Sequence, residues 1–198
     1  MIRIPEAGGI RLRAVAEMLI SNDEIIAATR RWLERSVIGL NLCPFAERVY
    51  RDDRVRFCLS EQRSASALLA ELRSELTYLN AADPDHCETT LLIHPWVLAD
   101  FIEYNDFLEV CEATIVELGL EGELQVASFH PQYQFEGTRS DDIENYTNRS
   151  PYPMLHLLRE ASIERAIAAL PDTDEIYRRN IRTLRHLGHA GWRRLWQD

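Results

Sequence analysis

The chain has 198 residues, a hydrophobic fraction of 46% and a formal net charge of −10. A chain of this length is most often one domain with a substantial core. Its acidic balance disfavours nucleic acid and anionic lipid surfaces as partners. No apolar run approaches the roughly 20 residues that span a bilayer, and charged residues interrupt the N-terminal segment where a secretory signal would lie. We therefore expect a cytoplasmic protein without membrane contact.

The basic residues are all arginine, 22 in number. The lack of lysine excludes Schiff-base chemistry, a lysine general base and a phosphate-binding loop with its Gly-Lys signature. The four cysteines are scattered without the spacing of a zinc knuckle or a disulfide framework. They are Cys43, Cys58, Cys87 and Cys111.

Residues 1–20 show no clear periodicity, and we interpret them as an extension before one globular domain over residues 21–198. Ser21 and Glu24 have the spacing of a capping box, which predicts a helix that runs to about Asn41. Pro44 disfavours helical geometry at the residue before it, so the helix stops or kinks there.

The middle of the chain alternates between strand and helix patterns. Strands are predicted at 54–59, 89–93 and 124–129, with helices over 64–79 and 101–118. This order favours an α/β fold with a small, mainly parallel sheet of three to four strands, flanking helices and a helical C-terminus. A ferredoxin-like α+β arrangement is the alternative, because a short strand is easily missed.

The C-terminal part is predicted to be helical. Ser150 is a candidate N-cap and Pro151 suits the first helical position, which predicts a helix from there to about Leu170. A last helix restarts at 171–173 and ends at Gly188. The short tail beyond contains two tryptophans, Trp192 and Trp196.

The most informative stretch is the polar segment from Ser128 to Glu160, which lies between the last predicted strand and this helix. Polar side chains crowded on a long connection between rigid elements are typical of a binding or catalytic site.

Two successive strands end in a His-Pro step, at His94 and at His130. If the strands are parallel, both histidines lie at the carboxyl edge of the sheet, where ligands bind in open α/β sheets. Neighbouring strands are close enough for the two imidazoles to share one site. The alternative is that each ring only bonds a loop carbonyl.

Asn148, Arg149 and Ser150 directly precede the predicted helix. Free backbone N–H groups and the helix dipole favour an anion there, and a guanidinium adds a bidentate grip on carboxylate or phosphate. The alternative is that Arg149 pairs with a loop acid, such as Asp141, and only pins the loop.

Three further features remain open. His156 would share a helix face with Arg159 and Glu160, either as an acid/base group or as part of a surface ion-paired trio. Cys43 would line the site or be a buried structural thiol. The loop acids and histidines match no established metal motif, so the metal and any cofactor stay unknown.

Three segments of the chain together resemble an uncharacterised bacterial family, the domain of unknown function 1415. They are Gly39–Ala46 (GLNLCPFA), Phe129–Phe135 (FHPQYQF) and Asn148–Arg159 (NRSPYPMLHLLR), and the likeness covers roughly Asp23 to His186. The resemblance implies no particular reaction. It implies that these segments belong to one shared pattern, consistent with one pocket.

The leading hypothesis is a hydrolase or group transferase that acts on a small anionic metabolite. The expected catalytic residues are His130, His156 and Asp141. The expected substrate-binding residues are Arg149, Asn148, Ser150, Tyr133, His94 and Cys43. The alternatives are a metal-binding protein and a non-catalytic binding or partner protein that uses the two C-terminal tryptophans, and the oligomeric state stays open.

Overall fold

The computed structural model describes residues 20–168 and 174–197. The predicted extension therefore lies outside the described residues except for Ile20, and the predicted helix restart at 171–173 lies outside them as well.

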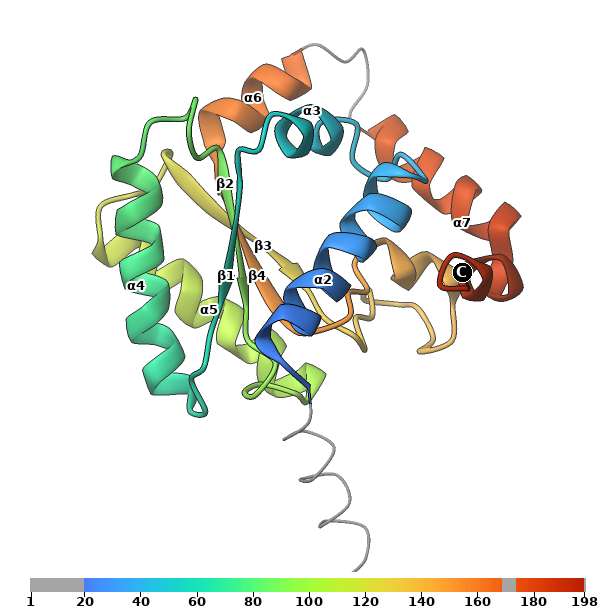
Figure 1. Cartoon of the computed structure of the whole chain (residues 1–198), viewed down its shortest axis with the longest axis horizontal. Helices are drawn as coiled ribbons and strands as arrows, with labels where there is room; N and C mark the ends of the chain where they lie inside the picture. Colours follow the sequence, from blue (N-terminus) through green and yellow to red (C-terminus); the bar gives the residue numbers. More distant parts are fainter. Residues whose placement is uncertain (1–19, 169–173, 198) are drawn as a thin grey trace, which may run out of the picture.

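A four-stranded sheet forms the centre of the fold (Figure 1). Its strands are β1 (Val55–Leu59), β2 (Thr89–Ile93), β3 (Leu124–Phe129) and β4 (Met154–Arg159), in the spatial order β1-β2-β4-β3. β1 and β2 pair in parallel, and β4 pairs antiparallel with both β2 and β3. Three strands thus run in the same direction and β4 runs against them. The predicted α/β class and the first three strands are confirmed, but two of the three strand pairings are antiparallel, so the sheet is mostly antiparallel rather than mainly parallel.

The prediction of a helix over 151–170 is wrong in its first part, where the structure has strand β4. Pro153 disfavours helical geometry at Tyr152, and the chain instead enters a strand whose residues Met154, Leu155 and Leu157 are fully buried. A central strand covered on both faces has a nearly continuous hydrophobic run, which resembles a buried helix segment in sequence. Only the later part of the predicted helix is helical, as α6 (Glu160–Ala168).

Helices cover the two faces of the sheet. On one face, α4 (Ala65–Ala81) and α5 (Phe101–Glu117) pack on a core that includes Leu72, Leu92 and Leu155. The other face carries α2 (Asn22–Trp32), a π-helix η1 (Leu33–Ile38) and α3 (Ala46–Arg51). This second core includes Ile25, Trp32 and Met154.

The first helix begins as the sequence predicts. The hydroxyl of Ser21 accepts from the Glu24 N–H at 3.2 Å, and the Glu24 carboxylate accepts from the Ser21 N–H at 2.7 Å. After Trp32 the helix widens into η1 and closes at Gly39, where a Cβ atom would lie 2.5 Å from the carbonyl oxygen of Arg35. The close approach explains why glycine occupies this position.

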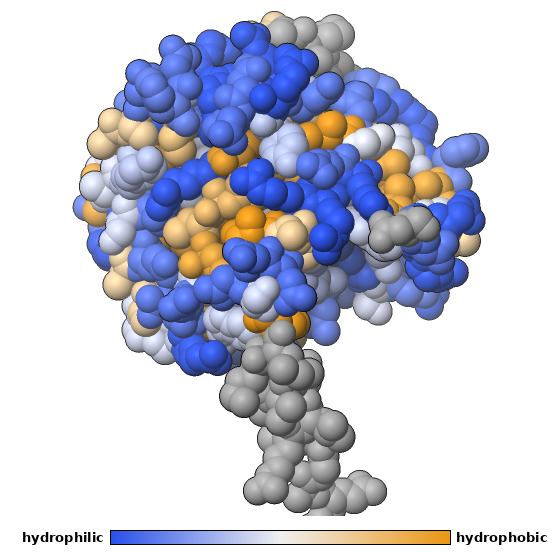
Figure 2. Space-filling view, viewed as in Figure 1, coloured by the Kyte–Doolittle hydropathy of each residue, from blue (hydrophilic) through white to orange (hydrophobic). Residues whose placement is uncertain are grey.

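β1 is an edge strand with a partly exposed apolar surface. Figure 2 shows hydrophobic atoms gathered between α4 and α2, over β1, on a face that is otherwise mostly hydrophilic. The guanidinium of Arg30 lies 4.1 Å from the ring centre of Phe57, and Arg56 forms a bidentate pair with Glu75. These charges on the edge disfavour pairing with another strand.

The C-terminal α7 (Asp174–Arg194) packs on a 3₁₀ helix η2 (Ile143–Thr147) of the polar segment. Its backbone leaves helical geometry at Gly188, where φ is 61°, as predicted, and a second helical stretch follows. That stretch carries Trp192, which forms a small core with Leu42 and Leu184.

Candidate functional site

The structure brings His94 and His130 to one edge of the sheet, where the ring of each lies against the ring of Tyr104. Both histidines are fully buried. The ring of Tyr104 lies 5.8 Å from that of His94 and 5.0 Å from that of His130, between centroids. The Tyr104 hydroxyl donates to the Met154 carbonyl and accepts from the Phe129 N–H, so it links the first residue of β4 to the last residue of β3.

Both imidazoles are bonded to nearby loops. His130 accepts from the Gln132 N–H through Nδ1 at 3.0 Å, so its proton lies on Nε2, 3.2 Å from the Leu98 carbonyl. His94 donates from Nδ1 to the Val97 carbonyl at 3.1 Å. Burial lowers the pKa of His130, and it lowers that of His94 to about 4, so both rings are neutral at pH 7. Together they hold a loop in which Leu98 has a positive φ of 56°.

The polar segment is ordered around Asn145, a residue that the sequence analysis did not single out. Its side-chain oxygen accepts from the Phe135 N–H and the Thr138 hydroxyl, and its amide donates to the Arg139 carbonyl. The side chain is fully buried. An Asn inside a polar stretch carries no sequence signal that separates this role from a solvated one.

Asn148 and Asp141 take different positions in this segment. The Asn148 amide donates to the Ser128 carbonyl at 3.1 Å and fixes the segment to the end of β3. Asp141 is exposed and lies 3.4 Å from Arg139 in an ion pair. No contact between Asp141 and either buried histidine is present among the described residues.

Arg149 braces the same segment from the other side. Its guanidinium donates to the carbonyls of Tyr133 and Ser140 and lies 4.3 Å from the ring centre of Tyr146. Its own carbonyl accepts from the Trp32 indole N–H at 2.8 Å. Arg149 thus pins the loop through carbonyls rather than through the loop acids that the sequence analysis considered.

The expected helix start at Ser150 is absent, because the chain continues towards β4. Ser150 is buried and its hydroxyl donates to the Tyr152 carbonyl at 2.6 Å. The predicted contribution of a helix dipole to anion binding is therefore wrong. Arginine side chains supply the positive charge here instead.

A cleft of about 620 Å³, called the arginine cleft below, opens beside Arg149. Its basic side chains come from α2, from η1 and from the polar segment: Arg31, Arg35 and Arg149. Its aromatic wall consists of Trp32, Tyr146, Trp192 and Trp196. Ser150, Pro131, Pro151 and Ala28 complete the lining. Among the described residues, no acidic side chain lines it.

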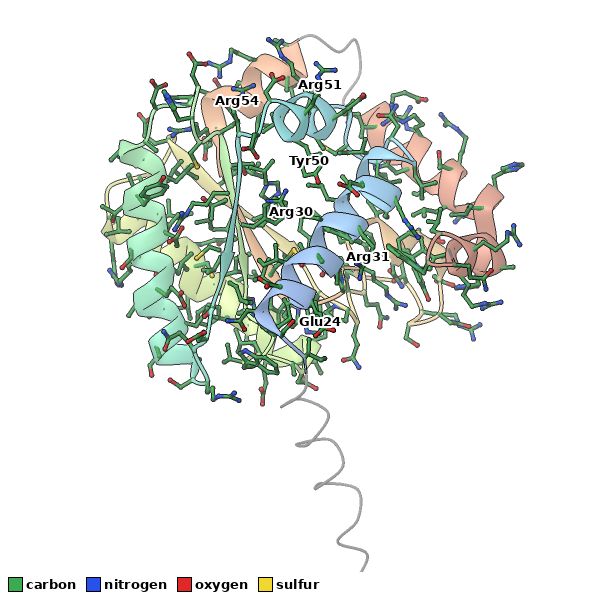
Figure 3. The ribbon with its side chains drawn as sticks, in the orientation of Figure 1. Glu24, Arg30, Arg31, Tyr50, Arg51 and Arg54 are labelled. Carbon is green, nitrogen blue, oxygen red and sulfur yellow. The ribbon has the colours of Figure 1, made fainter. Side chains whose placement is uncertain are left out.

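Arg31 and Arg35 are the residues that sequence reasoning missed. They lie four positions apart on the first helix, a spacing that also fits a solvated helix face. Figure 3 shows Arg31 on the side of α2 towards α7, while Arg30 lies on the opposite side, towards β1. The π-helix that carries Arg35 gives no clear signal in the sequence, although such segments are frequent at functional sites.

A second cavity, called the sheet-face cavity below, has a volume of about 390 Å³. It lies between the sheet and the helices η1, α3 and α6, and contains both His156 and Cys43 in its wall. Burial raises the pKa of the Cys43 thiol. His156 is a strand residue whose Nε2 lies 2.7 Å from the Thr89 hydroxyl, and burial lowers its pKa to about 4.

The predicted helix face with His156, Arg159 and Glu160 is wrong, because His156 and Arg159 belong to β4. Arg159 has its own role: one guanidinium nitrogen donates to three carbonyls at the end of α4 and the loop beyond. These are the carbonyls of Leu79, Ala82 and Cys87.

Within the described part of the chain, no group of three or more His, Cys, Asp or Glu side chains is placed to hold a metal ion. No helix in the same part is both long and apolar enough to cross a bilayer.

The chain belongs to the family described as protein of unknown function DUF1415, whose model matches residues 24–194. This confirms the resemblance seen in the sequence. Comparison with curated proteins and with solved structures gave no match.

Proposed function

We propose that this protein binds a small organic anion in the arginine cleft. The observation that carries the proposal is that three arginines, two from the first helix and one from the distant polar segment, line one concave site without an acidic side chain in its described lining. Arg35 and Arg149 also donate to backbone carbonyls, so Arg31 is the arginine best placed to bind an anion. Such a site attracts carboxylate or phosphate, and guanidinium groups can bind either in bidentate fashion.

The aromatic wall favours an anion that also has a flat apolar part. Trp192 packs edge-on against Tyr146 with centroids 4.9 Å apart, and Trp196 packs against Trp192 at 5.7 Å. Trp196 keeps 39% of its surface exposed. Rigid aromatic side chains offer contact area at low entropic cost, so an aromatic carboxylate or a phosphate ester suits the cleft better than inorganic phosphate.

Binding is better supported than catalysis. None of the described side chains that line the cleft is a His, Cys, Asp or Glu, so none exchanges a proton near pH 7. A hydrolase or transferase in which His130 acts as the acid/base draws less support, because both of its ring nitrogens are bonded inside the protein. As part of the proposal we place the protein in the cytoplasm, which the four free thiols support.

Calorimetric titration of the purified full chain with phenyl phosphate, benzoate and inorganic phosphate tests this proposal. Phenyl phosphate should bind more tightly than inorganic phosphate because only the former reaches the aromatic wall. Arg31→Ala should weaken binding by about tenfold or more, the loss of roughly 1.5–3 kcal/mol that a hydrogen bond to a charged group contributes.

Arg31 is a better target than Arg149, because Arg149 also braces the loop. Arg51 on α3 is the matched control, since it is exposed and lies away from the cleft (Figure 3). The proposal is wrong if none of the three anions binds at millimolar concentration. It is equally wrong if Arg31→Ala and Arg51→Ala bind as the unmodified protein does.

A further inference from the structure

The sheet-face cavity is separate from the arginine cleft and has the opposite character. Its wall is built mainly from apolar side chains of η1, the sheet and α6, for example Leu33, Leu91, Leu158 and Ile163. Its volume of about 390 Å³ lies within the range of about 300–1,000 Å³ that small-molecule sites occupy. An apolar wall of this size is suited to a small hydrophobic molecule.

His156 gives this cavity one polar group of defined character. The Thr89 hydroxyl donates its single proton to the Leu157 carbonyl at 2.6 Å, so the 2.7 Å contact with His156 must be a donation from Nε2–H to Thr89. The other ring nitrogen, Nδ1, is then an acceptor, and it has no hydrogen-bond partner among the described residues. The lowered pKa of His156, about 4, keeps the ring neutral at pH 7.

We propose that the sheet-face cavity binds a small, neutral, mainly apolar molecule whose hydroxyl group donates a hydrogen bond to Nδ1 of His156. A carboxylate or phosphate does not fit, because a neutral imidazole acceptor offers it no proton. The two charged residues in the described lining are both engaged: Arg159 donates to three backbone carbonyls, and Glu88 is paired with Arg54 at 3.1 Å. The Cys43 thiol, with its raised pKa, stays uncharged at pH 7.

This site is independent of the proposed anion binding. The two linings have Trp32 in common, and each has its own polar groups. Saturating phenyl phosphate in the arginine cleft should therefore leave the sheet-face cavity available, and each proposal can fail without the other.

The test uses 1-naphthol and naphthalene, which differ by one hydroxyl group, titrated into the full chain and followed by tryptophan fluorescence and calorimetry. We expect 1-naphthol to bind about two- to tenfold more tightly, the range that one net hydrogen bond gives. Ala166 on α6 lines the cavity, so Ala166→Phe should block both ligands. Ala161→Phe, at an exposed position on the same helix, should not.

Ala127→Leu fills the cavity from β3 and serves as the blocking variant if Ala166→Phe fails to fold. Failure of both ligands to bind the unmodified protein at their solubility limit would overturn the proposal. Binding that survives in folded blocking variants would place the ligand elsewhere and also overturn it. Equal affinity for 1-naphthol and naphthalene would refute the role of His156, and loss of the difference in His156→Phe would support it.

Discussion

Acidification should destabilise this protein through His94. The side chain is fully buried, and its Nε2 has no hydrogen-bond partner in the structure. Its pKa of about 4 in the folded protein lies below the usual value of 6.5 for an unfolded chain. Between these two values the unfolded chain binds a proton that the folded protein does not. The free energy of unfolding therefore falls as the pH drops from about 6.5 towards 4.

The magnitude follows from the same two values. From pH 7 to pH 5, the His94 contribution decreases by about 2 kcal/mol, at roughly 1.4 kcal/mol per pH unit below 6.5. For a domain of this size, that loss lowers the melting temperature by about 4–8 °C. Buried carboxylate pairs add little above pH 5, because an ordinary carboxyl titrates near pH 4.

Urea denaturation at pH 7 and pH 5 measures this effect, with His94→Asn as the test variant. The Asn amide can still donate to the Val97 carbonyl but carries no titratable group. Its loss of stability between the two pH values should be about 2 kcal/mol smaller than that of the unmodified protein. His186→Asn, at an exposed position on α7, controls for the removal of a histidine. Identical losses in His94→Asn and the unmodified protein would refute the reasoning, because His94 would then accept a proton in the folded state.

Two further predictions concern the framework around the cavities. Arg159→Met keeps the apolar stem of the side chain but removes the donor to three carbonyls near the end of α4. The free energy of unfolding, measured in urea, should therefore fall by about 2–3 kcal/mol. The control Arg165→Met, at an exposed position, should change it by less than about 0.5 kcal/mol. Asn145→Ala removes the hydrogen bonds at the centre of the polar segment, and limited proteolysis should cut between residues 133 and 149 at least tenfold faster. An unchanged cleavage rate would show that the hydrogen bonds of Asn145 do not order the segment.

The elements that sequence reasoning predicts well are those whose pattern is local. β1, β2 and β3 are flanked by turns, and α4 and α5 carry leucines and phenylalanines at helical spacing. β4 is different, because the run from Met154 to Leu158, which is apolar except for His156, fits a strand and a helix equally well. Its pairing with β2 and β3, both distant in sequence, decides between them. Because this one element was predicted as a helix, His156 was expected on a helix face, whereas it lies on a central strand of the sheet.

The candidate site could likewise be predicted only in part from the sequence. The arrival of His94 and His130 at one sheet edge follows from strand direction, which the alternation of elements predicts. Their neutral, structural state does not, because it depends on Tyr104 and on carbonyls of a loop that the sequence leaves undefined. The arginine cleft depends on a contact between Trp32 and Arg149, which are 117 residues apart. No local pattern encodes a contact at that separation.

Trp32 explains how one chain can hold two cavities of opposite character so close together. Its indole is 98% buried, contributes to the walls of both cavities and donates its only N–H to the Arg149 carbonyl. The ring therefore presents apolar surface to each side while its single polar group is already bonded. The Trp32 ring would separate an anion in the arginine cleft from an apolar molecule in the sheet-face cavity. Neither ligand can displace this ring without breaking its hydrogen bond to the Arg149 carbonyl. The same bond places Arg149, so the shape of the cleft depends on the packing of the second core beneath it.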